Sequence, residues 1–165
     1  MKTLLLLRHA KSSWKDSDID DHERPLNKRG KRDAPRMGRL LREENLLPDL
    51  ILTSSAKRCR KTAEHLIQTS SYRGETRITS DLYEANGEKL RGIVAGISDD
   101  ISRLLLIGHN PGLEELLEPL AGIYTPLTTA ALAHLELPIE RWSDIASDSR
   151  GKLLQLWQPR ELEDS

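Results

Sequence analysis

A run of four leucines, Leu4 to Leu7, leads directly into Arg8 and His9 near the start of the chain. The leucines favour burial, whereas a charged or polar side chain is costly to bury unless another group pairs with it. Either the chain leaves the core at Leu7 by chance, or the buried run holds Arg8 and His9 at a defined place. The remaining sequence favours the second interpretation.

Short apolar runs alternate with amphipathic stretches, a pattern typical of an α/β fold whose sheet is mostly parallel. The predicted strands cover residues 3–7, 49–53, 77–79, 103–107, 130–137 and 152–157. The last two alternate apolar and polar residues more regularly than the others, so we expect them toward a sheet edge. The predicted helices cover residues 28–44, 56–68 and 88–97 and a stretch that begins at Pro111.

Local signals mark the helix ends and the loops. Asn27 is the predicted N-cap of the first helix, and Pro35 inside that helix predicts a kink or a later start. Asn110 is the predicted N-cap of the last helix, with a proline at its first position. The segments richest in loops are 10–26 and 138–151.

Length and composition bound the class of protein. At 165 residues the chain is expected to form a single domain, 1–165, that can bury its own core. The net charge of −1 leaves no basic excess to follow a phosphate backbone, so nucleic acid is not an expected partner. The single cysteine, Cys59, favours a reducing compartment. The run Leu4–Leu7 is too short for a membrane span or a signal-peptide core, so we expect a cytoplasmic protein without membrane contact.

Polar residues follow three of the predicted buried strands at the point where each strand ends. Arg8 and His9 follow the first strand, and Arg58 lies just after the second. His109 and Asn110 follow the fourth. The carboxyl ends of parallel strands share one crevice, where ligands bind in open α/β sheets. Helix N-termini attract anions and arginine offers a planar fork of donors, so this group of residues indicates a phosphoryl site.

Each of these residues also has an ordinary structural interpretation. His9 could belong to a surface loop, Arg58 to a solvated helix face, and His109 to a turn. Glu84, with acidic neighbours, could simply be exposed. Their coincidence at three strand ends, in a chain whose buried runs are otherwise apolar, favours a site. The remaining histidines are interpreted as structural, and they are His22, His65 and His134.

Five motifs occur along the chain in the order LLLLRHAKS, HERPLNKRG, ILTSSAKRCRKTAE, DLYEA and LLIGHNPGL. Together they resemble the histidine phosphatase superfamily, and more closely its small phosphohistidine phosphatases of the SixA type. The resemblance covers residues 3 to about 113, and the order and spacing of the motifs make it specific. It implies a three-layer α/β sandwich of the phosphoglycerate mutase-like kind, with a mostly parallel central sheet, helices on both faces and no large cap insertion.

The resemblance implies roles for six residues, each carried over by its motif. His9 would be the nucleophile that becomes phosphorylated, and Glu84 would give a proton to the leaving group. The phosphoryl oxygens would be bound by Arg8, Arg58 and His109, and Arg24 of the RPL motif would line the same pocket. No metal or cofactor is expected. Three more polar residues lie close to the motifs: Ser12, Ser13 and Asn110.

Elementary chemistry supports these roles. Phosphoryl transfer needs in-line positioning and stabilisation of the charge on three equatorial oxygens, which cationic side chains and backbone N–H groups can supply. An imidazole nucleophile must be neutral, and adjacent arginines favour neutrality by lowering its pKa. Hydrolysis then takes two displacements, with water attacking the phosphohistidine in the second. Glu84 would donate a proton in the first displacement and accept one in the second.

Two positions depart from the superfamily pattern. Ala10 stands where a glycine usually follows the Arg–His pair, which restricts the backbone slightly and leaves the chemistry intact. Lys11 stands where many relatives carry an acidic residue, which disfavours the mutase branch. Little chain remains for insertions over the pocket, so we expect an open pocket that suits a phosphate carried by a protein histidine.

Other functions stay open beside hydrolysis of protein phosphohistidine. A phosphatase for a small phosphorylated metabolite would use the same residues, because leaving-group specificity would lie in loops 10–26 and 138–151. A non-catalytic phosphate-binding protein would keep the arginines and lose the nucleophile or the acid, yet all these positions hold competent residues. The chain lacks a C-x5-R loop at Cys59, a G-x4-G-K-[ST] motif and a compact metal-ligand cluster. These absences argue against cysteine phosphatases, P-loop enzymes and metallohydrolases.

Overall fold

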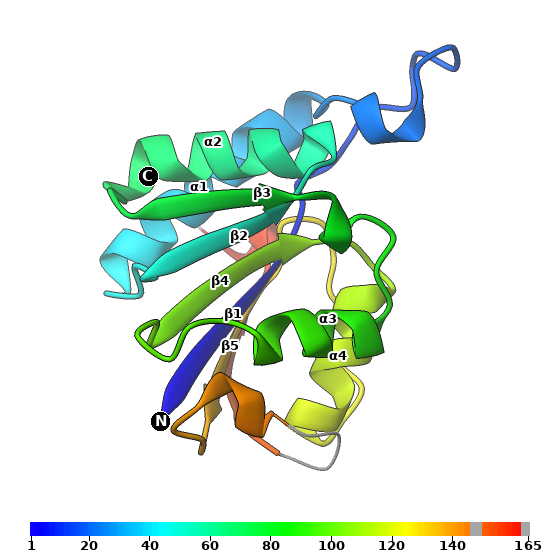
Figure 1. The fold of residues 1–165 in the computed structure, drawn as a ribbon. Coiled ribbons are helices and arrows are strands. Elements are labelled where there is room, and N and C mark those ends of the chain that lie inside the picture. Colours follow the sequence, from blue (N-terminus) through cyan, green and yellow to red (C-terminus); the bar gives the residue numbers. More distant parts are fainter. Residues whose placement is uncertain (146–149, 163–165) are drawn as a thin grey trace.

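The computed structural model describes residues 1–145 and 150–162, which form a sheet between two layers of helices (Figure 1). The strands are β1 (Lys2–Arg8), β2 (Leu50–Ser54), β3 (Glu75–Thr79), β4 (Arg103–Gly108), β5 (Leu132–Leu137) and β6 (Lys152–Trp157). The helices are α1 (Lys28–Glu43), α2 (Lys57–Ser70), α3 (Gly87–Ala95) and α4 (Gly112–Ala121). Short 3-10 turns are η1 (Asp21–Glu23), η2 (Ser80–Leu82), η3 (Trp142–Asp144) and η4 (Pro159–Glu161). The predicted strands and helices are all present, and their ends differ from the prediction by one or two residues at most.

The sheet has the strand order β3-β2-β4-β1-β5-β6. The first four strands in this order are parallel, whereas β5 is antiparallel to β1 and β6 is antiparallel to β5. The two strands with alternating residues therefore lie at one edge, as predicted. The α/β class with a mostly parallel sheet is confirmed, and the order β2-β4-β1 sets three carboxyl strand ends side by side.

The leucine run of β1 is continuous because both faces of the sheet are covered. Leu4 and Leu6 pack in the core cluster that includes residues of α3 and α4, and Leu5 and Leu7 pack in the cluster beneath α1 and α2. The two helix pairs lie on opposite faces of the sheet in Figure 1. Successive strand side chains point to opposite faces, so a strand covered on both sides needs an apolar residue at every position.

Helix α1 begins where the sequence predicts. The Asn27 side chain accepts a hydrogen bond from the Gly30 backbone N–H at 2.9 Å, which satisfies one of the free donors of the first turn. The expected late start at Pro35 is wrong, since α1 runs from Lys28 to Glu43 with Pro35 inside it, and the alternative of a kink stays a prediction. Pro35 has no N–H to donate to the carbonyl of the residue four positions earlier, Lys31, which is an exposed residue.

Helix α4 begins one residue later than predicted, and its N-cap is Pro111 rather than Asn110. The Asn110 side chain is engaged elsewhere, because its Nδ2 donates to the Leu127 carbonyl at 2.8 Å. Two carboxylates in the first turn, those of Glu114 and Glu115, complement the positive end of the helix instead.

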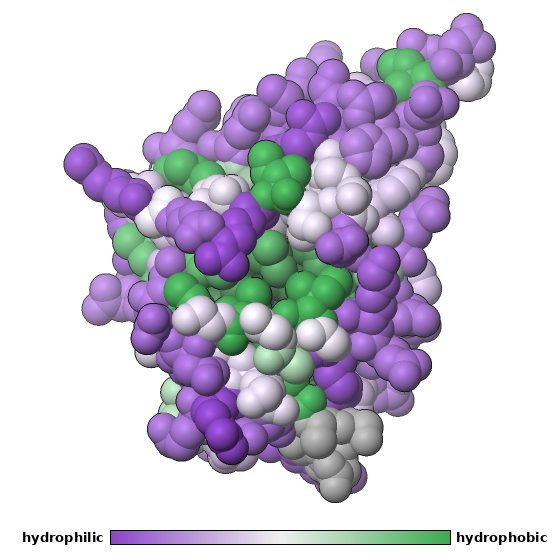
Figure 2. All heavy atoms as spheres, in the orientation of Figure 1, coloured by the Kyte–Doolittle hydropathy of each residue, from purple (hydrophilic) through white to green (hydrophobic). Residues whose placement is uncertain are grey.

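The loops and the surface complete the fold. The segment between β1 and η1 projects beyond the ends of α1 and α2 (Figure 1). Of the loop expected over 138–151, positions 146–149 lie outside the described residues, and η3 lies within the rest. Figure 2 shows a mostly hydrophilic face with apolar side chains gathered at its centre, over the sheet. Across 1–145 and 150–162, every helix is too short or too polar to cross a bilayer.

The close approach of α4 to the loop after η2 leads to a stability prediction. A Cβ on Gly112 would lie 2.1 Å from the Ala85 carbonyl oxygen, next to Glu84, whereas a Cβ on Gly92 of α3 would meet nothing within 4 Å. We expect Gly112→Ala to lower the free energy of unfolding by about 1–3 kcal/mol, the usual cost of overpacking. The matched control Gly92→Ala should raise it by about 0.5–1 kcal/mol, because alanine is the better helix former. Urea unfolding of both variants measures the two changes, and equal effects would contradict the packing argument.

Candidate active site

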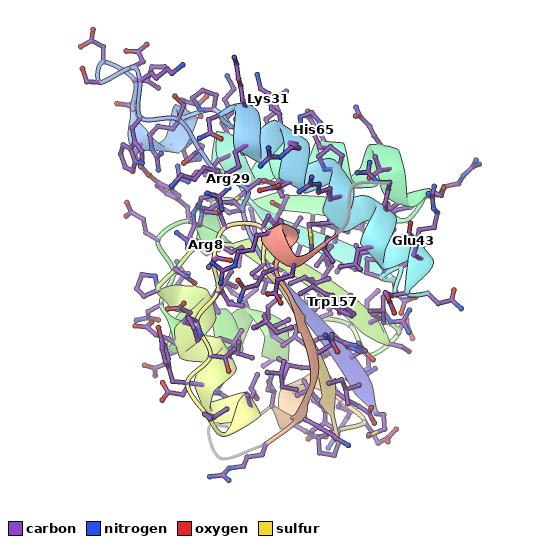
Figure 3. All side chains as sticks on the ribbon, turned by 180° about the vertical axis from the view of Figure 1, so that it is seen from behind. Arg8, Arg29, Lys31, Glu43, His65 and Trp157 are labelled. Carbon is purple, nitrogen blue, oxygen red and sulfur yellow. The ribbon has the colours of Figure 1, made fainter. Side chains whose placement is uncertain are left out.

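The three strand ends open into one cavity of about 440 Å³. Its lining includes all six residues that the sequence singled out: Arg8, His9, Arg24, Arg58, Glu84 and His109. Parallel pairing sets Arg8 of β1 opposite Gly108 of β4, so the residues that follow both strands leave the sheet at one level. Figure 3 shows Arg8 at this end of β1, on the side of the molecule where α4 begins.

His9 is buried, with 7% of its surface exposed, and its ring is held in one tautomer. Its Nδ1 lies 2.8 Å from the Ala10 carbonyl oxygen. Because a carbonyl can only accept, Nδ1 carries the hydrogen and Nε2 keeps its lone pair. Burial lowers the pKa of His9 to about 3 against the opposing effect of the Ala10 carbonyl, and His109, Arg58 and Arg8 lower it further. The sequence predicts that the arginines keep His9 neutral, but burial lowers the pKa of His9 more than the arginines do.

The backbone around His9 is tied to three neighbouring elements. The His9 N–H donates to the Gly108 carbonyl at 3.1 Å, and the Ala130 N–H donates to the His9 carbonyl at 3.1 Å. The Ala10 N–H donates to the Thr62 hydroxyl of α2 at 3.0 Å. The position of the imidazole is therefore set by main-chain contacts on both sides of β1.

The three arginines reach the cavity with part of each guanidinium already paired. Arg8 Nη1 donates to the Leu127 carbonyl at 3.0 Å, and Arg24 Nη1 donates to the Ser12 hydroxyl at 2.6 Å. Arg58 Nη1 donates to a backbone carbonyl of η1 at 2.7 Å. Within the described residues, the Nε–H groups of Arg8 and Arg58 are buried and have no partner. A buried donor without a partner is costly, so these two groups favour an anion in the cavity.

His109 faces His9, with the ring centroids 5.3 Å apart. Burial lowers the pKa of His109 to about 4, and Arg58 lowers it further, so the ring is neutral near pH 7. Its Nδ1 lies 3.4 Å from Arg58 Nη2, and its Nε2 lies 2.8 Å from the Ser54 hydroxyl. The arginine can only donate, so Nε2 carries the hydrogen while this contact exists.

Cys59 lies beside His109, with its Sγ 3.5 Å from Nε2. Burial raises the pKa of the Cys59 thiol to about 12. The thiol therefore stays protonated near pH 7, and a protonated thiol is a poor nucleophile.

Glu84 lies at the rim of the cavity with an unusual backbone conformation. Its φ is 60°, in the left-handed region that residues other than glycine rarely occupy. Such a conformation costs on the order of 1 kcal/mol and is found preferentially at functional sites. Among the described residues its exposed carboxylate makes no hydrogen bond or ion pair, which leaves it available to a ligand.

Several lining residues were not identified from the sequence, and three of them, Asp21, Tyr83 and Trp14, are tied to the arginines directly or through one another. Asp21 accepts hydrogen bonds from Arg24 and Arg58, and the Tyr83 hydroxyl donates to Asp21. The Trp14 ring lies 3.5 Å from the Arg24 guanidinium, and 71% of Trp14 is exposed. One signal was available, because Asp21 lies three residues before Arg24, a spacing at which opposite charges meet in a helical turn. Nothing local in the sequence marks Tyr83 or Trp14.

The other polar candidates take different places. Ser12, Asn110 and Lys11 line the cavity. His22 contacts the Ser55 hydroxyl through Nε2 at 2.8 Å, and His134 stacks on Trp157 at the sheet edge. Figure 3 shows His65 beside Lys31 on the outer side of the helix pair, away from Arg8. The part of the chain that the structure describes contains no group of three or more His, Cys, Asp or Glu able to hold a metal ion.

Known proteins share this sequence pattern and this fold. The sequence profile of the histidine phosphatase superfamily (branch 1) matches residues 4–105. An uncharacterized chloroplastic protein of Arabidopsis thaliana is 34% identical over 152 residues, which cover 87% of this chain and 70% of that protein.

Solved structures agree with this match. A protein of Agrobacterium tumefaciens named as the phosphohistidine phosphatase SixA superimposes with a TM-score of 0.82 at 27% identity, over 96% of this chain and 98% of that chain. A protein of Escherichia coli named as an alpha-ribazole-5'-P phosphatase has the same fold, with a TM-score of 0.73 at 15% identity over 96% and 98% of the two chains. The chain therefore belongs to the histidine phosphatase superfamily, as a phosphatase of the SixA type.

Proposed function

We propose that this phosphatase works through a covalent phosphohistidine on His9 and acts on protein phosphohistidine, as a single domain over residues 1–165. The observation that carries the proposal is a buried, neutral imidazole with its Nδ1–H given to the Ala10 carbonyl, beside two buried guanidinium donors without partners. A lone pair next to unpaired cationic donors is the arrangement that transfer of a phosphoryl group requires.

In the first displacement Nε2 of His9 attacks the phosphorus atom. The bond from phosphorus to the leaving nitrogen or oxygen breaks, and the protonated Glu84 carboxyl gives its proton to the leaving group. Arg8, Arg24, Arg58 and His109 stabilise the charge that is spread over the three equatorial oxygens. Because the Ala10 carbonyl holds the Nδ1–H, it also stabilises the positive charge that the ring acquires.

In the second displacement a water molecule attacks the phosphorus of phosphorylated His9. The Glu84 carboxylate accepts a proton from this water, and the bond between phosphorus and Nε2 breaks. Inorganic phosphate leaves, His9 returns to its neutral form, and Glu84 is again protonated. Every group in this cycle belongs to the chain, so neither a metal nor a cofactor takes part in the proposed steps.

The preference for a protein substrate is supported by the rim of the cavity and by the likeness to SixA. Trp14 and Glu84 lie at the rim and are exposed, so a phosphorylated side chain on a large carrier can approach them. The 27% identical neighbour is named as a phosphohistidine phosphatase. A small phosphorylated metabolite is the second candidate, because a neighbour with the same fold is named as an alpha-ribazole-5'-P phosphatase.

The proposed substrate class predicts the outcome of a turnover comparison. We expect a phosphohistidine peptide to be hydrolysed with a higher kcat/KM than phosphoserine peptides or a panel of sugar phosphates. His9→Ala should abolish turnover of all of them, and brief exposure of the wild type to substrate should leave an acid-labile, alkali-stable label on His9. Faster hydrolysis of a sugar phosphate would favour the metabolite function, and full activity in His9→Ala would overturn the mechanism.

The proposed role of Glu84 predicts an effect that depends on the leaving group. General acid catalysis contributes about 10²–10⁴-fold, and an alkoxide needs the proton far more than an imidazole does. Glu84→Gln should therefore lower kcat by about 100-fold or more for an alkyl phosphate and by about tenfold or less for phosphohistidine. Glu88→Gln, an exposed carboxylate in the first turn of α3, is the matched control and should leave both rates unchanged. Equal losses for both substrates would remove Glu84 from the role of proton donor.

A neutral His9 in the folded protein also predicts a loss of stability in acid. The pKa of His9 falls from its usual 6.5 to about 3 on folding, so between these values the unfolded chain binds a proton that the folded chain does not. Stability must then fall as the pH is lowered, by about 2 kcal/mol from this residue between pH 7 and pH 5. Urea unfolding at the two pH values should show that His9→Asn loses about 2 kcal/mol less stability on acidification than the wild type does. The control His65→Asn should lose as much stability as the wild type. An unchanged pH dependence in His9→Asn would mean that folding does not lower the pKa of His9.

A further inference from the structure

Asp21, the first residue of η1, contacts three lining residues of the cavity. Its Oδ1 accepts from Arg24 Nε at 2.9 Å, and its Oδ2 accepts from Arg58 Nη2 at 3.0 Å and from the Tyr83 hydroxyl at 2.6 Å. Its backbone carbonyl accepts from Arg58 Nη1 at 2.7 Å. We propose that Asp21 is a positioning residue that orients Arg58 and Arg24 toward the phosphoryl group and does not itself touch the substrate. This inference rests on the proposed function, in which both arginines bind phosphoryl oxygens.

The hydrogen bonds of Arg58 show which edge of its guanidinium Asp21 uses. Both terminal nitrogens, Nη1 and Nη2, are bonded to Asp21, so the end of the guanidinium is taken. The Nε–H lies on the other edge and is buried without a partner in the described part of the chain. A guanidinium can bind one oxyanion along each edge. Asp21 and a phosphoryl group can therefore be bound to Arg58 at the same time.

Burial explains why a carboxylate is needed at this place. The side chains of Arg24 and Arg58 are only 8% and 7% exposed. A buried guanidinium without a counter-charge is costly, and two of them near each other repel. The Asp21 carboxylate bridges the two guanidinium groups, and its single negative charge offsets one of their two positive charges. The hydrogen bond from Tyr83, together with those from Arg24 and Arg58, holds the pKa of Asp21 well below its usual range, so the carboxylate stays ionised near pH 7.

Asp21 itself contributes little to the core. Its side chain is 45% exposed, and η1 contains no buried residue. Removal of its charge is therefore expected to disturb the orientation of the arginines far more than the fold. A residue that served stability alone would show the opposite balance, and this difference makes the inference testable.

The test compares Asp21→Asn with Asp20→Asn, which removes the same charge from the neighbouring position, where the side chain makes no cap hydrogen bond. Calorimetry measures the binding of inorganic phosphate, and thermal unfolding measures stability. The values of kcat and KM are determined with a phosphohistidine peptide. We expect Asp21→Asn to weaken phosphate binding and to lower kcat/KM by about 10–100-fold, as misplaced binding groups do, with little change in the melting temperature. Asp20→Asn should match the wild type within about twofold in both measurements.

A double-mutant comparison of Asp21 and Arg58 distinguishes a positioning role of Asp21 from a general effect of its charge on phosphate binding. If Asp21 acts through Arg58, the double variant Asp21→Asn/Arg58→Ala should lose less phosphate affinity than the product of the two single losses. A second variant, Tyr83→Phe, removes only the hydroxyl that donates to Asp21 and should weaken phosphate binding a few-fold in the same direction. This variant decides the matter if Asp21→Asn does not fold.

Three results would overturn the inference. The first is tighter phosphate binding in Asp21→Asn, which would mean that the carboxylate competes with the substrate for the arginines. The second is full additivity of the losses caused by Asp21→Asn and Arg58→Ala. The third is unchanged phosphate binding in both Asp21→Asn and Tyr83→Phe. Failure of the proposed function is distinguishable, because wild-type protein would then not turn over phosphorylated peptides. The calorimetric phosphate measurement would still report on Asp21 in that case.

Discussion

The parallel pairing of β2, β4 and β1 is the constraint on which the site depends. The register sets Arg8 opposite Gly108, and Thr53 opposite Ile107, so the polar residues that follow each strand leave the sheet at one level. A shift of β1 that drew Arg8 into the place of Leu7 would be costly, because the covered part of the sheet holds apolar side chains and a guanidinium there would lose its water. The core thus determines where the imidazole of His9 lies.

The same surroundings leave arginine charged and histidine neutral in this cavity. Burial lowers the pKa of Arg8, and it lowers those of His9 and His109 to about 3 and about 4. A guanidinium begins from a pKa so high that it stays charged after such a shift, whereas an imidazole near 6.5 becomes neutral. The same cationic pocket can therefore hold cationic donors and a neutral nucleophile side by side. No separate device is needed to keep the two histidines deprotonated.

The sequence predicts the elements of this fold well because burial on both faces leaves a simple signature. A continuous apolar run such as Leu4–Leu7 has few alternatives to a central strand, and the polar residues at its end are visible for the same reason. Asn110 was assigned the wrong role because its amide is bonded to the Leu127 carbonyl, far along the chain, and no local pattern reveals that competition. Asp21 and Tyr83 escaped notice on the same ground. Their significance comes from the hydrogen bonds that Asp21 accepts from Arg58 and from Tyr83, which lie on two other segments of the chain.

The contact between Ser54 and His109 has a consequence for the ligands that this edge of the cavity can accept. A hydroxyl can give or receive a hydrogen bond by rotating about one C–O bond, so it suits either neutral tautomer of the ring 2.8 Å away. While the contact with Arg58 exists, the ring accepts from Arg58 at Nδ1. When an oxyanion arrives, the ring proton can reside on Nδ1 instead, with Ser54 then donating to Nε2. The polarity of this edge of the cavity can thus reverse to suit its occupant without any heavy atom of the histidine moving.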